Sequence, residues 1–140
     1  MTEPGCHHLI GVIDDDTGIR ETLSEILADE GYEVLAAQDG RDALRQLRSE
    51  GAHKPCLILL DLMMPVMTGA QFYREQQADS SLKSIPICLL SADGDLASKA
   101  AELGVQFMAK PVRIEAVLDV VHRHCARHGG EASGLATGGD

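Results

Sequence analysis

Aromatic and basic residues are scarce in this sequence. It contains no tryptophan, two phenylalanines and two tyrosines, and its 12 lysine and arginine residues are outnumbered by 22 aspartate and glutamate residues, giving a formal net charge of −10 at pH 7. A chain with this charge repels a polyanion instead of recruiting it through counterion release. It also lacks a set of aromatic side chains on which bases could stack. We therefore expect no nucleic-acid binding.

Long apolar stretches are also missing. The run Leu57–Leu60 is broken by Asp61, and it is far shorter than the ~20 residues that a membrane-spanning helix needs. The first residues carry Glu3 and Pro4 instead of the basic and apolar segments of a secretory signal. The sequence predicts a soluble, cytoplasmic protein that makes no membrane contact and whose mature chain begins at Met1.

The few cysteines are widely spaced, at Cys6, Cys56, Cys88 and Cys125. No two of them have the short spacing that is typical of a zinc knuckle. Cys56 and Cys88 lie inside apolar runs, where a thiol behaves as a small hydrophobic group. We expect reduced thiols, and a disulfide or a zinc site is the alternative.

The chain does contain enough apolar residues for one ordinary domain, since 44% of its 140 residues are hydrophobic. Five short apolar runs are typical of strands, and they are His8–Ile13, Glu33–Ala37, Cys56–Leu60, Ile85–Leu90 and Val105–Ala109. Five amphipathic stretches alternate with them. Apolar residues recur at helical spacing in three sets: Ile19, Leu23, Ile26 and Leu27, then Ala43, Leu44 and Leu47, then Leu96, Ala100 and Leu103. A last helix is predicted from Val112 to about His124, with one apolar face formed by Val117, Val120 and Val121.

Capping residues mark the ends of these helices. Thr17 and Asp39 stand where N-caps belong, and Asp16 is also placed to cap a helix. Glycines that suit a left-handed cap follow three of the helical patterns, at Gly31, Gly51 and Gly104. We expect residues 1–7 to form an N-terminal extension, residues 8–128 a folded domain, and residues 129–140 a flexible glycine-rich tail.

Repeated strand–helix alternation indicates the fold class. Strands that are apolar enough to be covered on both faces are typical of a parallel sheet with right-handed crossovers. We predict an α/β fold, a doubly wound (βα)5 sandwich around a five-stranded parallel sheet. Ligands of such sheets bind beyond the carboxyl ends of the strands.

Polar residues gather at this edge of the predicted sheet, where the strands are followed by Asp14, Asp15, Asp16, Asp61, Ser91 and Lys110. Converging carboxylates repel one another, so they need shared protons or a cation of high charge density. Oxygen ligands without a nearby histidine or cysteine favour Mg²⁺. With a lysine ammonium and a serine hydroxyl, such a site would stabilise a transferring phosphoryl group, and Asp61 is the obvious nucleophile.

In these residues the sequence resembles the receiver domain of two-component response regulators, the CheY-like family. The resemblance covers about His8 to His124 and rests on elements in the same order: Asp14-Asp15 after an apolar strand, Arg20 shortly after, the run Asp61-Leu62-Met63-Met64-Pro65 with Thr68-Gly69, Ser91-Ala92, and Lys110-Pro111. It implies the flavodoxin-like strand order 2-1-3-4-5 and identifies residues 8–128 as a receiver domain.

The resemblance also implies roles for the site residues. Asp61 would be the phosphoacceptor, and Ser91 and Lys110 would bind the phosphoryl oxygens. The Mg²⁺ ligands would be Asp15, Asp61 and the backbone carbonyl of Met63, with Asp14 acting through water. The phosphoryl donor would be a sensor histidine kinase or a phosphotransfer protein. The domain would promote its own phosphorylation and dephosphorylation, as a signalling protein and not as an enzyme for other substrates.

Output would pass through the face formed by the fourth helix, the fifth strand and the fifth helix. Since few residues follow His128, we expect the output to be a bound partner whose identity the sequence does not give. Phe107 stands where many receivers carry a switching tyrosine. It is either a residue that changes rotamer together with Ser91 or a buried core phenylalanine.

Two further residues are expected to tune the lifetime of the phosphorylated state. Met63 and Asp93 follow Asp61 and Ser91 by two residues, where side chains can exclude or orient the attacking water. We expect shielding by Met63 to prevail. For Met63 and Met64 we favour apolar fill over a soft-metal pair, and we interpret Asp93 and Asp95 mainly as loop and N-cap residues.

Histidines cluster near the end of the last helix, at His122, His124 and His128. His124 and His128 have the i, i+4 spacing of a zinc pair, but no carboxylate accompanies them, so we favour solvated residues at a helix end.

Two other functions remain as alternatives. A haloacid-dehalogenase-type phosphohydrolase also uses a strand-end aspartate, but it needs a second aspartate where this chain has Met63. The other is a receiver-like interaction module that takes no phosphoryl group.

Overall fold

The computed structural model describes residues 8–92, 94 and 96–129. Strands and helices alternate along the chain in the order β1 (Leu9–Ile13), α1 (Thr17–Asp29), β2 (Glu33–Ala37), α2 (Gly40–Leu47), β3 (Leu57–Asp61), α3 (Gly69–Gln77), β4 (Ile87–Ser91), α4 (Leu96–Leu103), β5 (Gln106–Ala109) and α5 (Ile114–Gly129). The strands form one sheet in the order β2-β1-β3-β4-β5, and every pairing is parallel. The predicted doubly wound fold and its strand order are confirmed.

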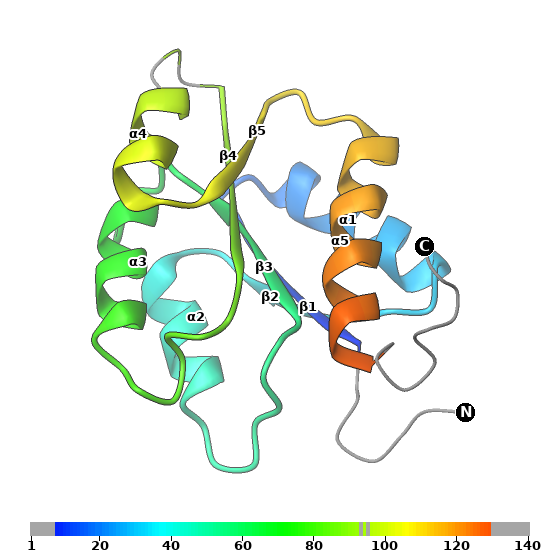
Figure 1. Cartoon of the computed structure of the whole chain (residues 1–140), viewed down its shortest axis with the longest axis horizontal. Coiled ribbons are helices and arrows are strands. Elements are labelled where there is room, and N and C mark those ends of the chain that lie inside the picture. Colours follow the sequence, from blue (N-terminus) through cyan, green and yellow to red (C-terminus); the bar gives the residue numbers. More distant parts are fainter. Residues whose placement is uncertain (1–7, 93, 95, 130–140) are drawn as a thin grey trace.

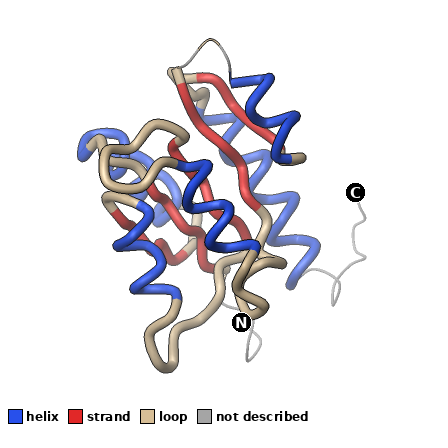
Figure 2. The backbone as a smooth tube through the Cα atoms, turned by 90° about the vertical axis from the view of Figure 1, so that its left-hand side faces the viewer, coloured by secondary structure: helices blue, strands red, loops and turns tan. Residues whose placement is uncertain are grey.

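Helices cover both faces of the sheet. In Figure 1, α2, α3 and α4 lie on one side of the strands, and α1 and α5 lie on the other. Figure 2 is viewed from the first side, and there helices cross in front of the strands. All strands run in the same direction, so their carboxyl ends meet at one edge, toward the top of Figure 1.

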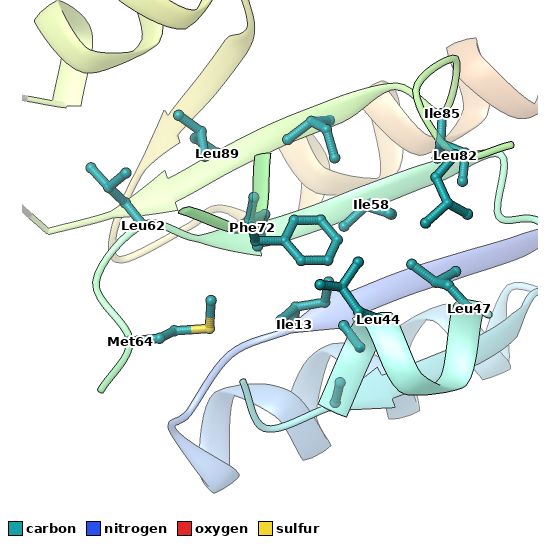
Figure 3. Close-up of a cluster of buried hydrophobic side chains, with 14 of the residues drawn as sticks. Ile13, Leu44, Leu47, Ile58, Leu62, Met64, Phe72, Leu82, Ile85 and Leu89 are labelled. Atoms are coloured by element: carbon teal, nitrogen blue, oxygen red, sulfur yellow. The ribbon is translucent and has the colours of Figure 1, made fainter. Parts of the chain in front are cut away.

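The core is divided into two halves by the sheet, because successive residues of a strand point to opposite faces. In β3, Ile58 and Leu60 join the half that packs against α2, α3 and α4, whereas Leu57 and Leu59 join the half that packs against α1 and α5. Figure 3 shows the first half, with the Phe72 ring pointing into its centre. In the second half, the valines predicted on one face of the last helix are buried: Val117, Val120 and Val121.

The two edge strands depart from the prediction that strands are covered on both faces. Every residue of β1, β3 and β4 is buried. By contrast, only Ala37 is buried in β2, and in β5 Phe107 and Ala109 are exposed. The sequence could not show this difference, because apolar content does not tell which strands end up at the edges of a sheet.

Element boundaries agree with the prediction to within two residues for the strands. β1, β3, β4 and β5 begin one or two residues later than predicted, and β3 and β4 each extend by one residue to include Asp61 and Ser91. The last helix begins at Ile114 instead of Val112 and continues past His124 to Gly129. The predicted extension at 1–7 lies outside the described residues, as does all of the predicted tail after residue 129.

Two predictions about capping have different outcomes. Asp39 caps α2, and its side chain accepts a hydrogen bond from the backbone of Asp42. Thr17 is not the N-cap of α1: it is the first helical residue, and Asp16 caps the helix by accepting from the backbone of Ile19. A positive φ is found at each predicted left-handed glycine, namely Gly31, Gly51 and Gly104.

Helix α3 has no apolar repeat in the sequence, because its buried face includes a polar residue. Gln76 is fully buried there, and its side-chain amide donates to the backbone carbonyls of Leu82 and Ile85. A capping box between Thr68 and Gln71 begins the helix and is the local signal that marks it. None of the helices within the described residues is long and apolar enough to cross a membrane.

Candidate functional site

Three carboxylates meet at the carboxyl edge of the sheet. Asp14 and Asp15 follow β1, and Asp61 is the last residue of β3. Because β1 and β3 pair in parallel with Ile13 opposite Leu60, these side chains come together, and one oxygen from each lies within 4.8 Å of the others. Asp14 and Asp61 are buried, with 1% and 3% exposure, whereas Asp15 is exposed. The predicted acidic cluster is therefore present.

Lys110 supplies the positive charge of this cluster. It follows β5, and its Nζ atom lies 2.9 Å from Asp14 Oδ2 and 3.3 Å from Asp61 Oδ1. The backbone of Lys110 is held by a hydrogen bond from its N–H to the Ser91 carbonyl, 2.9 Å away. The Lys110 side chain, which follows β5, thus forms ion pairs with the residues at the ends of β1 and β3.

Ser91 lies between the strands that carry Asp61 and Lys110. It is the last residue of β4, it is 2% exposed, and it pairs with Ala109 of β5. Among the predicted site residues, Asp93 lies outside the described residues, and so does Asp95. The other side chains predicted to act in the site, Asp14, Asp15, Asp61, Ser91 and Lys110, all belong to this one edge of the sheet.

The acidic cluster carries more negative than positive charge. Burial, the neighbouring charge of Asp14 and a hydrogen bond with Asp15 raise the pKa of Asp61 to about 7, although Lys110 acts in the opposite direction. Burial alone would lower the pKa of Lys110, but its contacts with Asp14 and Asp61 outweigh burial and raise it. The carboxylates stabilise the ammonium group, and one ammonium group does not offset all of their repulsion.

The residues present fit a hard divalent cation. The donor atoms are carboxylate oxygens, which Mg²⁺ prefers. The buried Asp14 Oδ2 atom accepts no hydrogen bond within the described residues and has only the ion pair with Lys110. A cation of charge +2 would bring the three carboxylates and the lysine close to electrical balance.

The turn after β1 is fixed by backbone contacts of the acidic residues. Asp14 Oδ1 accepts a hydrogen bond from the Asp16 N–H at 2.9 Å, and Asp16 in turn caps α1. The Arg20 guanidinium donates to the Asp14 carbonyl at 2.8 Å. Asp16 therefore has the capping role, and Arg20 positions the turn without reaching the carboxylates themselves.

Gly69 is required by the loop that follows Asp61. Its N–H donates to the Leu62 carbonyl at 2.9 Å, which folds the loop back onto the end of β3. A Cβ atom at this position would lie 2.7 Å from the Asp61 carbonyl oxygen and 2.8 Å from Leu62 Cα. The sequence pattern Thr68-Gly69 gave only a family resemblance, and the steric reason for the glycine becomes visible in the structure.

The apolar side chains near the site differ in the fraction of their surface that is exposed. Met64 is buried, as expected for apolar fill, but Met63 is 58% exposed, so the same interpretation is wrong for Met63. Phe107 is 46% exposed, so it is not a core phenylalanine. Phe107 lies on β5, an outer strand whose far side pairs with no other strand of the described chain.

The histidines of α5 make contacts that do not resemble a zinc site. His122 Nδ1 is hydrogen-bonded to the Tyr32 hydroxyl, and His124 Nε2 lies 2.7 Å from Gln106 Nε2. The acidic cluster is the only group of three potential metal ligands in the described part of the chain. His122 is exposed, as expected for a solvated residue, but His122 and His124 lie before the helix end at Gly129. The side chain of His128 is outside the described residues.

Replacing Asp61 should stabilise the protein when divalent cations are removed. In a chelator at pH 8, Asp61→Asn is expected to raise the free energy of unfolding by about 1–2 kcal/mol, because it removes a buried carboxylate whose pKa is raised on folding. The buried Asp61 carboxylate destabilises the wild type increasingly as pH rises from 3.8 toward 7. The difference in free energy of unfolding between Asp61→Asn and the wild type should therefore shrink in acid. Urea denaturation of both proteins at pH 8 and in acid measures these differences. A lower midpoint for Asp61→Asn than for the wild type at pH 8 would contradict the prediction.

Comparisons with known proteins agree with this geometry. Residues 10–122 match the family described as the response regulator receiver domain. Response regulator MprA of Mycolicibacterium vanbaalenii is 36% identical over 110 residues, which are 76% of this chain and 46% of MprA. Protein PilG of Pseudomonas aeruginosa is 34% identical over 116 residues, which are 81% of this chain and 84% of PilG. The crystallised chemotaxis protein CheY4 of Vibrio cholerae has a TM-score of 0.71 and 31% identity, covering 82% of this chain and 96% of that one.

The matched length differs among these relatives. The chain spans about half the length of MprA, whereas it spans most of PilG and nearly all of the CheY4 chain. The shared part is the region of residues 10–122, which contains the acidic cluster, Ser91 and Lys110.

Proposed function

This chain belongs to the response regulator receiver domain family of two-component signalling, and we propose that it acts as a phosphoryl-accepting switch with Asp61 as the phosphoacceptor. The donor would be a sensor histidine kinase or a phosphotransfer protein. The observation that carries the proposal is the buried Asp61 carboxylate at 3.3 Å from Lys110 Nζ, inside a cluster of three carboxylates. The domain would promote its own phosphorylation and dephosphorylation.

Among the three carboxylates, Asp61 is the best placed to accept the phosphoryl group. It ends β3, the central strand of the sheet, so Asp14 and Asp15 lie on one side of it and Ser91 on the other. Asp14 is bound to Lys110 and to the backbone of Asp16, and Asp15 is exposed. Asp61 therefore has the Lys110 ammonium group at 3.3 Å and is the one carboxylate of the three on a strand next to the strand of Ser91.

In the proposed reaction, an Asp61 carboxylate oxygen attacks the phosphorus atom of the donor. The bond between phosphorus and the donor's leaving group breaks, and the leaving group takes the bonding electron pair. Lys110 would move part of its charge interaction from the carboxylates to the phosphoryl oxygens, and the Ser91 hydroxyl would donate a hydrogen bond to them. Both groups stabilise negative charge that develops during transfer.

Asp15, Asp61 and the backbone carbonyl of Met63 would hold Mg²⁺, with Asp14 acting through water. When bound, Mg²⁺ supplies positive charge that reduces repulsion between the carboxylates and the incoming phosphoryl group. The Oδ1 atom of Asp61 pairs with the Lys110 ammonium group and also accepts a hydrogen bond from the Met63 N–H at 3.4 Å. These contacts hold the carboxylate in one orientation as it accepts the phosphoryl group.

Incubation with a small acyl phosphate donor tests the proposal. With Mg²⁺, intact mass measurement should show one added phosphoryl group, and with a chelator it should show none, because repulsion inside the cluster is then uncompensated. Ca²⁺ at the same concentration is the matched ionic control. Labelling that is equal with Mg²⁺ and with chelator would contradict the proposed role of Mg²⁺, and labelling at another residue would contradict the role of Asp61. No labelling under any of these conditions would contradict the proposal and leave the non-phosphorylated interaction module as the better function.

We further propose that the face formed by α4, β5 and α5 binds an output partner, and that Ser91 and Phe107 change together on phosphorylation. The exposed Phe107 ring has no hydroxyl group to fix it inward or outward, so burial alone would set its preference. NMR relaxation dispersion should detect exchange at this face before phosphorylation and a changed population with a phosphoryl mimic. A face that is rigid and unchanged by the mimic would refute this coupling.

The exposed Met63 side chain is proposed to lengthen the lifetime of the phosphorylated state. It follows Asp61 by two residues and has no group that could orient a water for in-line attack. Met63→Asn should therefore hydrolyse its acyl phosphate several-fold faster than the wild type. The loss of phosphorylated mass after donor removal gives the rate, with Val66→Asn, exposed in the same loop, as control. An unchanged or slower rate in Met63→Asn would show that Met63 does not shield the site.

A further inference from the structure

Asp15 is the exposed member of the acidic cluster, and its backbone is held on both sides. The Arg20 guanidinium donates a hydrogen bond to the carbonyl of the peptide group that joins Asp14 to Asp15, at 2.8 Å. The next peptide group joins Asp15 to Asp16, and its N–H donates to Asp14 Oδ1 at 2.9 Å. The two peptide groups that flank Asp15 are therefore each fixed by a side chain.

These contacts determine where the Asp15 side chain begins. A peptide group is planar and trans, so a contact that fixes its carbonyl oxygen also fixes its N–H and the two Cα atoms that it joins. Asp14 is itself held at the edge of the sheet, because its N–H donates to the Ala37 carbonyl of β2 at 3.1 Å. The freedom that remains at Asp15 therefore lies in its short side chain.

Arg20 can act as an anchor because α1 holds its backbone. It lies near the start of α1, the helix that Asp16 caps, and its N–H donates to the Asp16 carbonyl at 2.9 Å. Its guanidinium group also donates to the Thr17 hydroxyl at 3.3 Å. A planar guanidinium group with donors in fixed directions can hold the Asp14 carbonyl and this hydroxyl at once. Both oxygen atoms are neutral, so these contacts serve geometry more than charge.

The charge of Arg20 acts against cation binding. A guanidinium group near three carboxylates repels an incoming Mg²⁺ ion, so on electrostatic grounds alone its removal would strengthen binding. Loss of the hydrogen bond to the Asp14 carbonyl acts in the opposite direction, because the Asp15 backbone would then have to become ordered on binding. The direction of the change in Mg²⁺ affinity therefore tells which of the two effects of Arg20 prevails.

We propose that Arg20 is a positioning residue for the cation site, which holds the peptide group between Asp14 and Asp15 so that the Asp15 carboxylate lies beside Asp61. One oxygen from each of the three carboxylates lies within 4.8 Å of the others, and this is the arrangement that Arg20 maintains. The inference rests on the proposed Mg²⁺ site and adds to it a residue that does not touch the cation.

Titration with MgCl₂ followed by NMR tests the proposal. The full chain, isotopically labelled for amide NMR, is titrated as the wild type and as Arg20→Met, which keeps an unbranched apolar stem and donates no hydrogen bond. The shifts of the amide signals give the dissociation constant for Mg²⁺. Arg20→Met should bind Mg²⁺ about tenfold more weakly, at the low end of the range for residues that orient metal ligands.

Two further variants separate positioning from charge. Arg20→Lys keeps the positive charge and can still donate to the Asp14 carbonyl, so its Mg²⁺ affinity should lie between those of the wild type and Arg20→Met. Arg123→Met removes the same charge from an exposed position in α5, where Arg123 pairs with Asp119 at 3.1 Å. Its Mg²⁺ affinity should equal or slightly exceed that of the wild type, because solvent and salt screen this distant charge.

Urea denaturation in chelator is measured in parallel, because a merely structural role of Arg20 would lower the midpoint without weakening Mg²⁺ binding. Mg²⁺ binding in Arg20→Met that is as tight as in the wild type, or tighter, would overturn the inference alone. If Arg20→Met does not fold, wild-type affinity in Arg20→Lys would overturn it, because an ammonium group cannot hold both oxygen atoms in the same geometry. A wild type without Mg²⁺-dependent shifts would contradict the proposed cation site together with the inference.

Discussion

Asp61→Asn is expected to take up no phosphoryl group from a small acyl phosphate donor under conditions that label the wild type fully. The amide oxygen of asparagine is a poor nucleophile, and the substitution also removes the negative charge that Lys110 contacts at 3.3 Å. Asp119→Asn is the matched control, because Asp119 is an exposed residue of α5 that pairs with Arg123 far from the acidic cluster. Intact mass measurement of both variants beside the wild type gives the result.

A second variant separates loss of the nucleophile from loss of the cation. Asp15→Ala should also fail to label at a Mg²⁺ concentration that suffices for the wild type, because an exposed member of the acidic cluster is removed. Raising the Mg²⁺ concentration should restore labelling in Asp15→Ala and have no effect on Asp61→Asn. Labelling of Asp61→Asn equal to that of the wild type would end the assignment of Asp61.

Gly69→Ala should destabilise the domain by about 1–3 kcal/mol, the range for an added group in tightly packed surroundings. The new Cβ would lie 2.7 Å from the Asp61 carbonyl oxygen, and both close neighbours are backbone atoms that cannot rotate away. Urea denaturation should show a lower midpoint, and phosphorylation should slow because the end of β3 is displaced.

Gly94→Ala is the control for this substitution. Gly94 has no atom within 4 Å of the position that a Cβ would take, so its midpoint should stay close to that of the wild type. Equal midpoints for Gly69→Ala and the wild type would show that the loop after Asp61 rearranges at little cost.

The sequence predicts this fold well where the buried faces are purely apolar. β1, β3 and β4 are buried at every residue, so their apolar runs stand out. α3 has no such pattern, since its buried residues are Gly69, Phe72 and Gln76, and a helix with one large apolar side chain on its buried face shows no apolar repeat. The buried amide of Gln76 serves the loop before β4, and a loop contact of this kind leaves no periodic signal.

The candidate site could also be predicted in part from the sequence. Residues at the carboxyl ends of parallel strands could be placed together because the topology requires it, and the cluster of Asp14, Asp15 and Asp61 is present. The ion pair of Lys110 with Asp14 could not be predicted, because it depends on how far one side chain reaches across the sheet. The exposure of Phe107 depends on its place in an outer strand, which sequence periodicity does not record.

The outer position of β5 also affects how the molecule behaves in concentrated solution. Its free side hydrogen-bonds with no other strand of the described chain, and open edges of this kind are where separate sheets join and aggregate. β5 has only four residues, and it is followed by Lys110 and by Pro111, which has no backbone N–H. An intruding strand would find few hydrogen-bonding groups before meeting a charge and a proline. The shortness of β5 therefore protects against edge-to-edge aggregation although Phe107 stays exposed.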